Sequence, residues 1–291
     1  MEPVKCYIPE TLQEALELRK QTHATILAGG SDLMVSNGRG AGITPAFEKD
    51  VLILTGIKEL RGITETAETV EIGALTTSAE IAASPVVPEL LRDAASRMGA
   101  IALRNTATIG GNIGNASPKG DMPQPLILMD AEVVLKSADG ERRMLVDDYI
   151  IATKKTALRD DEIITKVIIP KPQFTHIFYR KIGMRRANAI SKLTLSAAAA
   201  VENGVVIDFR ASSGAAGPKV MRSRKAEEIL IGKKLAELAA VKEEFLDAWN
   251  GVISPHAMPE YRRNTTRRML SFFIDALIAG HPGGRVDVGE E

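Results

Sequence analysis

The stretch TIGGNIGNASPKGD, residues 108 to 121, restricts the possible folds more than any other part of this chain. It contains four glycines and two asparagines, ends in Asp121, and carries too little apolar mass to build a core. Because glycine has no Cβ, such a segment lets another group approach the main chain closely. The spacing matches neither the dinucleotide pattern G-x-G-x-x-G nor a P-loop. The stretch therefore indicates a binding loop of another type.

A second glycine-rich stretch, LAGGSD at 27–32, follows a short apolar run that is typical of a β-strand. Gly29 and Gly30 can adopt a positive φ, and main-chain N–H groups exposed there would suit phosphate oxygens. Taken alone, a Gly-Gly pair after a strand is more often a plain turn. Two such loops in one chain favour a large anionic cofactor, and a Cβ at Gly110 or Gly111 would then occupy space that a pyrophosphate needs. The alternative is a binding module without flavin in which these glycines form only turns.

Composition excludes several other functions. The 291 residues contain 37 Lys+Arg and 37 Asp+Glu, so no basic excess suggests nucleic acid. The single cysteine, Cys6, cannot hold an iron–sulfur cluster, and the four histidines lack metal-ligand spacing. The N-terminus lacks the apolar region of a signal peptide, and the longest apolar run, 193–201, is too short to span a bilayer. We therefore expect a cytoplasmic protein with no metal site, no nucleic-acid partner and no membrane segment.

The order of predicted elements indicates an α+β chain with boundaries near residues 55 and 172. An amphipathic helix at 11–21, with Thr11 as its N-cap, precedes the first glycine loop. Pro170 and Pro172 are typical of a linker, and three strands with an Asn-Gly turn follow them. Further strands are predicted near 51–56, 69–77, 132–137 and 163–169, helices at 223–231, 235–249 and 259–279, and a disordered tail at 281–291.

Three segments together resemble a known family. LAGGSDL near position 30, LRNTATIGGNIGNASPKGD near 110 and YRKIGMRRANAIS at 179–191 occur in the order and spacing of the FAD-binding medium subunit of molybdenum hydroxylases. That family includes the medium subunits of xanthine dehydrogenase, nicotinate dehydrogenase and aerobic carbon monoxide dehydrogenase. The resemblance implies a two-subdomain FAD-binding fold, similar to the vanillyl-alcohol-oxidase/PCMH type, that holds FAD between its subdomains. On this basis 1–55 would be the small α/β subdomain, 56–172 the larger α+β subdomain, and 173–280 a C-terminal domain of three antiparallel strands plus helices that closes over the flavin.

The resemblance also implies roles for individual residues. The two loops would contact the pyrophosphate and ribitol, Asp121 would accept from a sugar hydroxyl, Ile164 would contact the adenine side, and Lys181 would reach the polar edge of the flavin. No residue is expected to act as a general acid or base, so no catalytic residue is predicted. The complete set of residues expected to bind the cofactor is Thr25, Ile26, Leu27, Ala28, Gly29, Gly30, Ser31, Asp32, Leu33, Ala100, Thr108, Ile109, Gly110, Gly111, Asn112, Asn115, Asp121, Ile164 and Lys181.

The sequence departs from the family pattern at a few positions. Lys119 and Gly120 precede Asp121 where relatives carry small or apolar residues, and Met98 falls where some relatives have an aromatic residue over the flavin. These departures leave open whether the acceptor of electrons is NAD or oxygen. Neither glycine loop contains a histidine that could attach FAD covalently, so we expect FAD to be bound non-covalently.

The resemblance implies an electron-transfer subunit of a heteromeric complex. A large partner subunit would carry molybdopterin and oxidise the substrate, and a small partner subunit would carry two [2Fe–2S] clusters. FAD in this chain would take the electrons and pass them on, with NAD as the expected acceptor, in a dimer of heterotrimers. The alternative is a stand-alone FAD-dependent oxidoreductase, or a flavin-binding protein without molybdenum partners.

Overall fold

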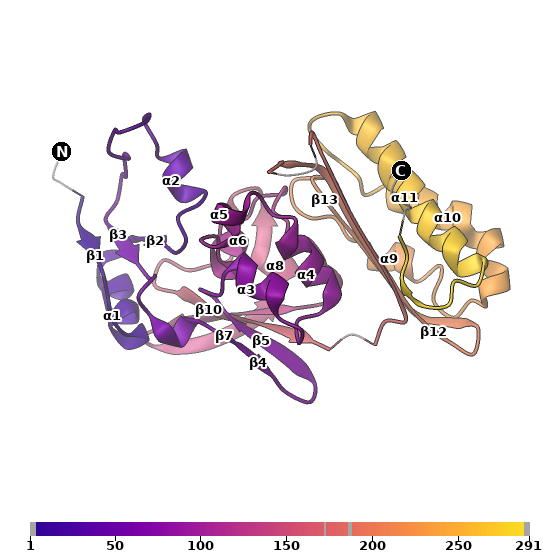
Figure 1. The fold of residues 1–291 in the computed structure, drawn as a ribbon, viewed down its shortest axis with the longest axis horizontal. Helices are drawn as coiled ribbons and strands as arrows, with labels where there is room; N and C mark the ends of the chain where they lie inside the picture. The colour runs from indigo at the N-terminus through magenta and orange to yellow at the C-terminus, as the bar shows by residue number, and fades with distance from the viewer. Residues whose placement is uncertain (1–3, 172, 186–187, 288–291) are drawn as a thin grey trace.

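The computed structural model describes residues 4–171, 173–185 and 188–287. Three larger β-sheets follow one another along the long axis of the molecule and are built from successive parts of the chain (Figure 1). Their strands fall within residues 6–53, 63–170 and 176–285. Within the described residues, no helix combines the length and the apolar content needed to cross a membrane.

The first sheet is parallel and small, with strand order β1-β3-β2. The helix α1 packs beside it, and its predicted N-cap is confirmed because the Thr11 hydroxyl accepts a hydrogen bond from the Glu14 main-chain N–H. Leu16 on α1 and Leu52 on β3 are fully buried in the core of this unit. The elements are β1 (Cys6–Tyr7), α1 (Leu12–Thr22), β2 (Thr25–Leu27), α2 (Leu33–Ser36) and β3 (Val51–Ile53), followed by the 3-10 turn η1 (Lys58–Leu60).

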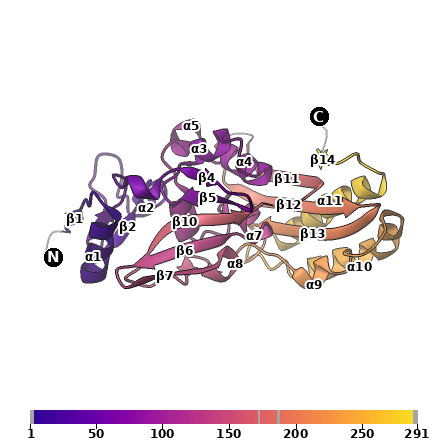
Figure 2. The same ribbon diagram turned by 90° about the horizontal axis from the view of Figure 1, so that it is seen from below.

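The second sheet is antiparallel, with order β4-β5-β10-β6-β7, and a group of short helices packs against it (Figure 2). The central strand β10 has an irregular register between Ile164 and Lys166. The strands are β4 (Ile63–Glu65), β5 (Thr69–Gly73), β6 (Glu132–Ser137), β7 (Gly140–Leu145) and β10 (Ile163–Pro170), with a separate hairpin of β8 (Ile150–Ala152) and β9 (Lys155–Thr156). The helices are α3 (Ser78–Ala83), α4 (Glu89–Ser96), α5 (Ile101–Arg104), α6 (Ile109–Gly114), α7 (Pro123–Leu128) and α8 (Val146–Tyr149).

The third sheet has order β13-β12-β11-β14, and α10 and α11 cover its outer face (Figure 1). The predicted Asn-Gly turn joins β12 to β13, and Asn203 and Gly204 both have positive φ, at 50° and 75°. The elements are β11 (His176–Gly183), β12 (Ser191–Glu202), β13 (Val205–Gly214), α9 (Arg224–Glu227), η2 (Leu235–Glu237), α10 (Leu238–Asn250), α11 (Pro259–Ile278) and β14 (Gly284–Arg285).

Successive alanines of β12 face two different cores. Ala197 and Ala199 pack with the apolar residues of α10 and α11, whereas Ala198 packs with the core of the second sheet. Both faces of the strand are covered, and this explains why the run from Ala197 to Val201 is continuously apolar instead of alternating. Alanine side chains are small, so helices and strands approach closely on either side.

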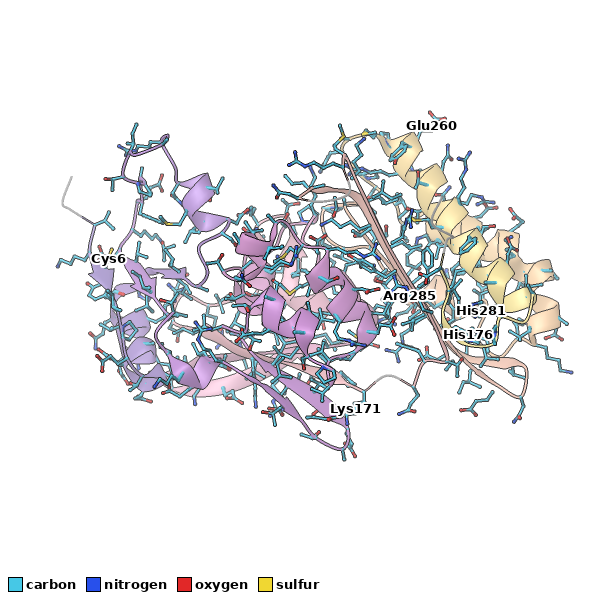
Figure 3. The ribbon with its side chains drawn as sticks, in the orientation of Figure 1. Cys6, Lys171, His176, Glu260, His281 and Arg285 are labelled. Atoms are coloured by element: carbon cyan, nitrogen blue, oxygen red, sulfur yellow. The ribbon has the colours of Figure 1, made fainter. Side chains whose placement is uncertain are left out.

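The prediction of a disordered tail is wrong for residues 281–287, and residues 288–291 lie outside the described residues. Gly284 and Arg285 form β14, which pairs in parallel with His176 and Ile177 of β11. Val286 is buried, and Arg285 contacts Asp93 and Asp287. Figure 3 shows Arg285 and the histidine pair His176 and His281 near one another at this end of the sheet (Figure 3). The glycine-rich sequence has little preference of its own for a β-strand, but pairing with β11 compensates for this.

Glu162, just before β10, forms a bidentate ion pair with Arg142 of β7, at 2.6 Å to Nε and 2.8 Å to Nη2. Its carboxylate also accepts from the main-chain N–H of Arg159 at 2.8 Å. Burial opposes ionisation, yet these hydrogen bonds lower the pKa of Glu162 below its ordinary value.

We expect Glu162→Gln to reduce the free energy of unfolding by about 1–3 kcal/mol at neutral pH. Because the folded-state pKa lies below the unfolded value of about 4.3, the ionised group stabilises fully above that value, and its contribution is lost as the pH falls through the folded pKa. Urea unfolding of both proteins across pH 3–7 measures this effect. A difference between the two proteins that stays constant down to pH 3 would contradict the assignment.

Candidate functional site

A pocket of about 460 Å³ lies between the first glycine loop and the second sheet. This volume is within the range of sites for small molecules and cofactors. The β2–α2 loop forms one wall, and α6 with the start of β10 forms the other. From the residues predicted to bind the cofactor, those that line the pocket are Ile26, Ala28, Gly29, Gly30, Ser31, Asp32, Leu33, Thr108, Gly110, Gly111, Asn112, Asn115 and Ile164.

Residues 28–33 of the first loop line this pocket. Gly30 has φ 68°, and a Cβ built on Gly29 would lie 1.8 Å from the carbonyl oxygen of Thr106. Glycine is therefore required at both positions, for the left-handed turn and for the close approach to the neighbouring chain. Within the described residues, no acceptor pairs with the main-chain N–H groups of Gly29, Gly30, Ser31 or Asp32. Such a group of unpaired donors is suited to an anion.

The second loop differs from the expectation of open backbone because it forms the short helix α6. The Thr108 hydroxyl caps the helix by accepting from the Gly111 N–H at 3.1 Å. The N–H groups of Ile109, Gly110 and Asn112 donate to carbonyl oxygens of this chain. The donors of 109–112 are therefore already used, in contrast to those of Gly29 through Asp32 in the first loop.

The two neighbouring glycines of α6 have different roles. A Cβ on Gly110 would lie 2.8 Å from the Ala74 Cβ and 2.9 Å from the Ala74 carbonyl oxygen, so Gly110 allows α6 to pack against the end of β5. A Cβ on Gly111 would lie 2.9 Å from the Thr108 Oγ1 and 3.7 Å from the Ala28 Cβ, across the pocket. The expectation that a Cβ would enter cofactor space therefore stays a prediction for Gly111, whereas at Gly110 the first obstacle is the protein itself.

The remaining predicted residues lie outside the lining of this pocket: Thr25, Leu27, Ala100, Ile109, Asp121 and Lys181. Asp121 and Lys181 form an ion pair at 2.7 Å, and both side chains are only 8% exposed. Ser191 donates to the other oxygen of Asp121 at 2.9 Å, and Lys181 also donates to the Arg97 carbonyl oxygen. Burial raises the pKa of the Asp121 carboxyl, against the opposing effect of Lys181. A role for this pair at the sugar and the flavin edge stays a prediction.

Sequence reasoning missed several residues of the pocket. Apolar residues from the ends of β3, β5 and β9 complete it, and these look like ordinary core residues in the sequence. Lys154, in the β8–β9 turn, had no motif around it that could have marked it. The residues missed are Ser36, Leu54, Ala74, Leu75, Ala107, Gly114, Lys154, Leu158 and Ile163.

Other charged groups have structural partners. Arg267 of α11 pairs with Glu243 and Asp247 of α10, and Arg262 and Arg263 donate to main-chain carbonyl oxygens. These three arginines of α11 are therefore paired within the chain. Among the described residues, no three or more His, Cys, Asp and Glu side chains gather in a way that could hold a metal ion.

Family models match most of the chain. Residues 2–172 match the FAD binding domain in molybdopterin dehydrogenase, and residues 178–277 match the CO dehydrogenase flavoprotein C-terminal domain. These matches define the class: an FAD-containing subunit of an oxidoreductase. The chain belongs to the family of FAD-binding medium subunits of molybdenum hydroxylases.

Individual relatives agree with this membership. The chain is 34% identical to the nicotinate dehydrogenase FAD-subunit of Eubacterium barkeri, covering 81% of this chain and 82% of the relative. It is 30% identical to the glyceraldehyde dehydrogenase medium chain of Sulfolobus acidocaldarius, covering 78% and 80% respectively. The fold resembles a carbon monoxide dehydrogenase structure from Hydrogenophaga pseudoflava, with TM-score 0.85 and 27% identity, covering 96% of this chain and 99% of that one. The predicted family and fold class are confirmed.

Proposed function

We propose that this chain binds FAD non-covalently in the pocket between the first glycine loop and α6, and passes electrons from a partner's [2Fe–2S] clusters to NAD. The observation that carries the binding proposal is the set of unpaired N–H groups of Gly29 through Asp32 at a pocket of cofactor size. The donors suit the phosphates, and apolar residues such as Leu54 and Ile164 suit the rings.

The residues of this chain hold and orient the cofactor in this proposal. Bound FAD supplies redox chemistry that accepts and releases electron pairs. Gly30 and its neighbours hold the phosphates, and Thr108 keeps α6 in place by capping it. Lys181, on β11, is buried and paired with Asp121, and its positive charge would stabilise negative charge on a nearby flavin edge.

The proposed assembly is a heteromeric complex in the cytoplasm. A small subunit with [2Fe–2S] clusters and a large subunit with molybdopterin would join this chain in a dimer of heterotrimers. Support comes from the medium-chain names of several relatives, including the glyceraldehyde and carbon monoxide dehydrogenases. The substrate would bind the large subunit, so the sequence of this chain does not identify it.

An anaerobic spectroscopic experiment tests the proposal. We expect the purified chain, reconstituted with FAD, to show a bound-flavin absorption spectrum that NADH bleaches. The same sample should not hydroxylate xanthine, nicotinate, aldehydes or carbon monoxide. Turnover of any of these by the isolated chain would favour the alternative, a stand-alone flavin oxidoreductase. Bound flavin without bleaching would remove NAD as the acceptor, and lack of flavin binding would contradict the proposal itself.

A further inference from the structure

Lys154 lies on the wall of the pocket, in the turn between β8 and β9. It has φ 58°, and its main-chain N–H donates to the Ala116 carbonyl oxygen at 2.9 Å, directly after α6. It is the one lysine, arginine or histidine among the described residues that line this pocket. The turn therefore fixes one cationic side chain beside the glycine loops.

The side chain of Lys154 connects the two walls of the pocket. Its Nζ lies 2.9 Å from the Asp32 Oδ2 in the first loop, and it also donates to the Asn115 Oδ1 at the end of α6. The lysine and aspartate side chains are 54% and 57% exposed. An ion pair this exposed contributes only about 0–1 kcal/mol to stability, so stabilisation of the fold does not account for the arrangement.

The balance of charge at this wall suggests that Lys154 serves a bound anion instead. The diphosphate of FAD carries two negative charges, and the carboxylate of Asp32 would repel them at the same wall. The main-chain donors of the first loop carry only partial charges. Lys154 is the full positive charge within reach of Asp32, and its ammonium group could contact a phosphate oxygen in competition with that carboxylate.

We propose that Lys154 is a binding residue for the FAD diphosphate, and that Asp32 competes with the diphosphate for its ammonium group. This inference rests on the proposed FAD function. It assigns a charged contact on the β8–β9 turn, outside both glycine loops.

The first test compares FAD affinities by fluorescence titration of the full-length apoprotein. Lys154→Met should weaken FAD by about 10- to 100-fold, the effect of removing a charge-assisted hydrogen bond. Lys154→Arg should keep most of the affinity. Lys155→Met is the matched control, since Lys155 is an exposed neighbour that does not line the pocket, and it should bind FAD like the wild type.

The second test separates charge supply from a purely structural bridge. Asp32→Asn releases Lys154 from its carboxylate, so FAD should bind as tightly as in the wild type or up to about tenfold more tightly, because a competing charge is removed. If the ion pair only held the two walls together, Asp32→Asn would weaken FAD as much as Lys154→Met. That result would overturn the inference.

The outcomes also distinguish this inference from the proposed function. Wild-type affinity in Lys154→Met would overturn the role of Lys154 and leave FAD binding intact. Failure of the wild-type chain itself to bind FAD would overturn the proposed function and this inference with it. Thermal unfolding of each variant shows whether an altered affinity comes from altered folding.

Discussion

Gly111→Val should abolish FAD retention while the chain stays folded. The added side chain would enter the gap between α6 and the first loop, where a Cβ alone would lie 3.7 Å from the Ala28 Cβ. Loss of part of the Thr108 cap would cost about 1 kcal/mol, which a chain of this size tolerates. We expect FAD affinity to fall by about 100-fold or more, because the valine methyl groups occupy cofactor space.

Gly110→Val is the informative comparison at the neighbouring position. Its Cβ would lie within 3 Å of both the Ala74 Cβ and the Ala74 carbonyl oxygen, in a buried position between α6 and β5. Overpacking of this kind costs about 1–3 kcal/mol or more, so this variant should lose stability as well as flavin. Flavin content and thermal unfolding, measured together, separate the two. Full flavin occupancy in Gly111→Val would show that α6 is not part of the binding site.

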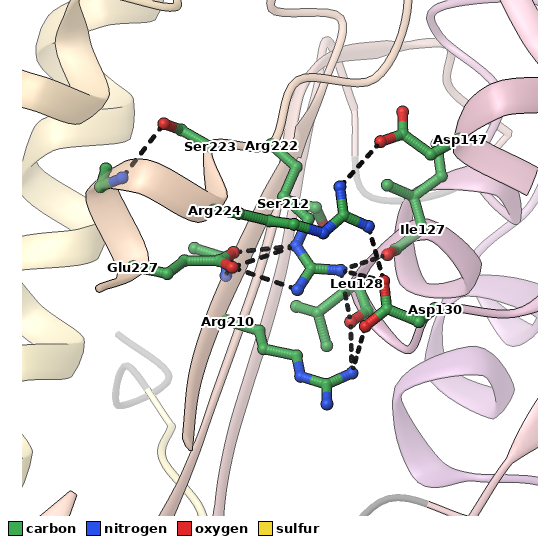
Figure 4. A network of polar contacts seen from close by, with 12 residues as sticks. Ile127, Leu128, Asp130, Asp147, Arg210, Ser212, Arg222, Ser223, Arg224 and Glu227 are labelled. Atoms are coloured by element: carbon green, nitrogen blue, oxygen red, sulfur yellow. Dashed lines mark hydrogen bonds and ion pairs between the residues drawn. The ribbon is translucent and has the colours of Figure 1, made fainter. Parts of the chain in front are cut away.

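Arg222→Met should destabilise the chain by about 3–5 kcal/mol, because it leaves Glu227 buried without its partner. Both side chains are only 4% exposed, and the Arg222 Nε lies 2.9 Å from the Glu227 Oε1. Figure 4 shows the same guanidinium reaching the other side of the domain boundary (Figure 4). There it donates to the Ile127 carbonyl oxygen and to Asp130, both at 2.8 Å.

Arg224→Met is the matched control for this substitution. Arg224 contacts the same Asp130, at 2.7 Å, but its side chain is 49% exposed. Its removal should cost only about 0–1 kcal/mol. Chemical denaturation of both variants measures the difference. Equal stabilities would mean that the contacts of Arg222 at the boundary contribute little.

Local signals in the sequence were sufficient for several elements. The Asn203-Gly204 turn, the Thr11 cap and the tight turn at Gly30 each depend on residues within a few positions of one another. Short-range chemistry of this kind is the same in any fold, so it can be read before the fold is known.

Features that depend on distant residues could not be read in the same way. Lys154 meets Asp32 across 122 positions, and Arg222 meets Asp130 across 92. Neither lysine nor arginine has a sequence context that identifies its partner. The tail strand β14 was missed for the same reason, since its backbone pairs with β11, more than 100 residues earlier. The sequence also could not show that the Gly110 N–H donates to the Ala74 carbonyl oxygen, because that depends on where Ala74 lies in the fold.

The alternation of alanines in β12 has a consequence for how cooperatively this protein unfolds. One strand supplies side chains to two cores, and Tyr179, Ala198 and Val220 all join the core of the second sheet, so that core is incomplete without the C-terminal half. The flavin-holding half and the C-terminal half should therefore melt as a single cooperative unit, although two family models describe them separately. A chain cut between them would expose apolar surface on both pieces and would invite aggregation. The C-terminal half is thus an integral part of the cofactor-binding half. We expect any relative that packs β12 in this way to carry both halves in one chain.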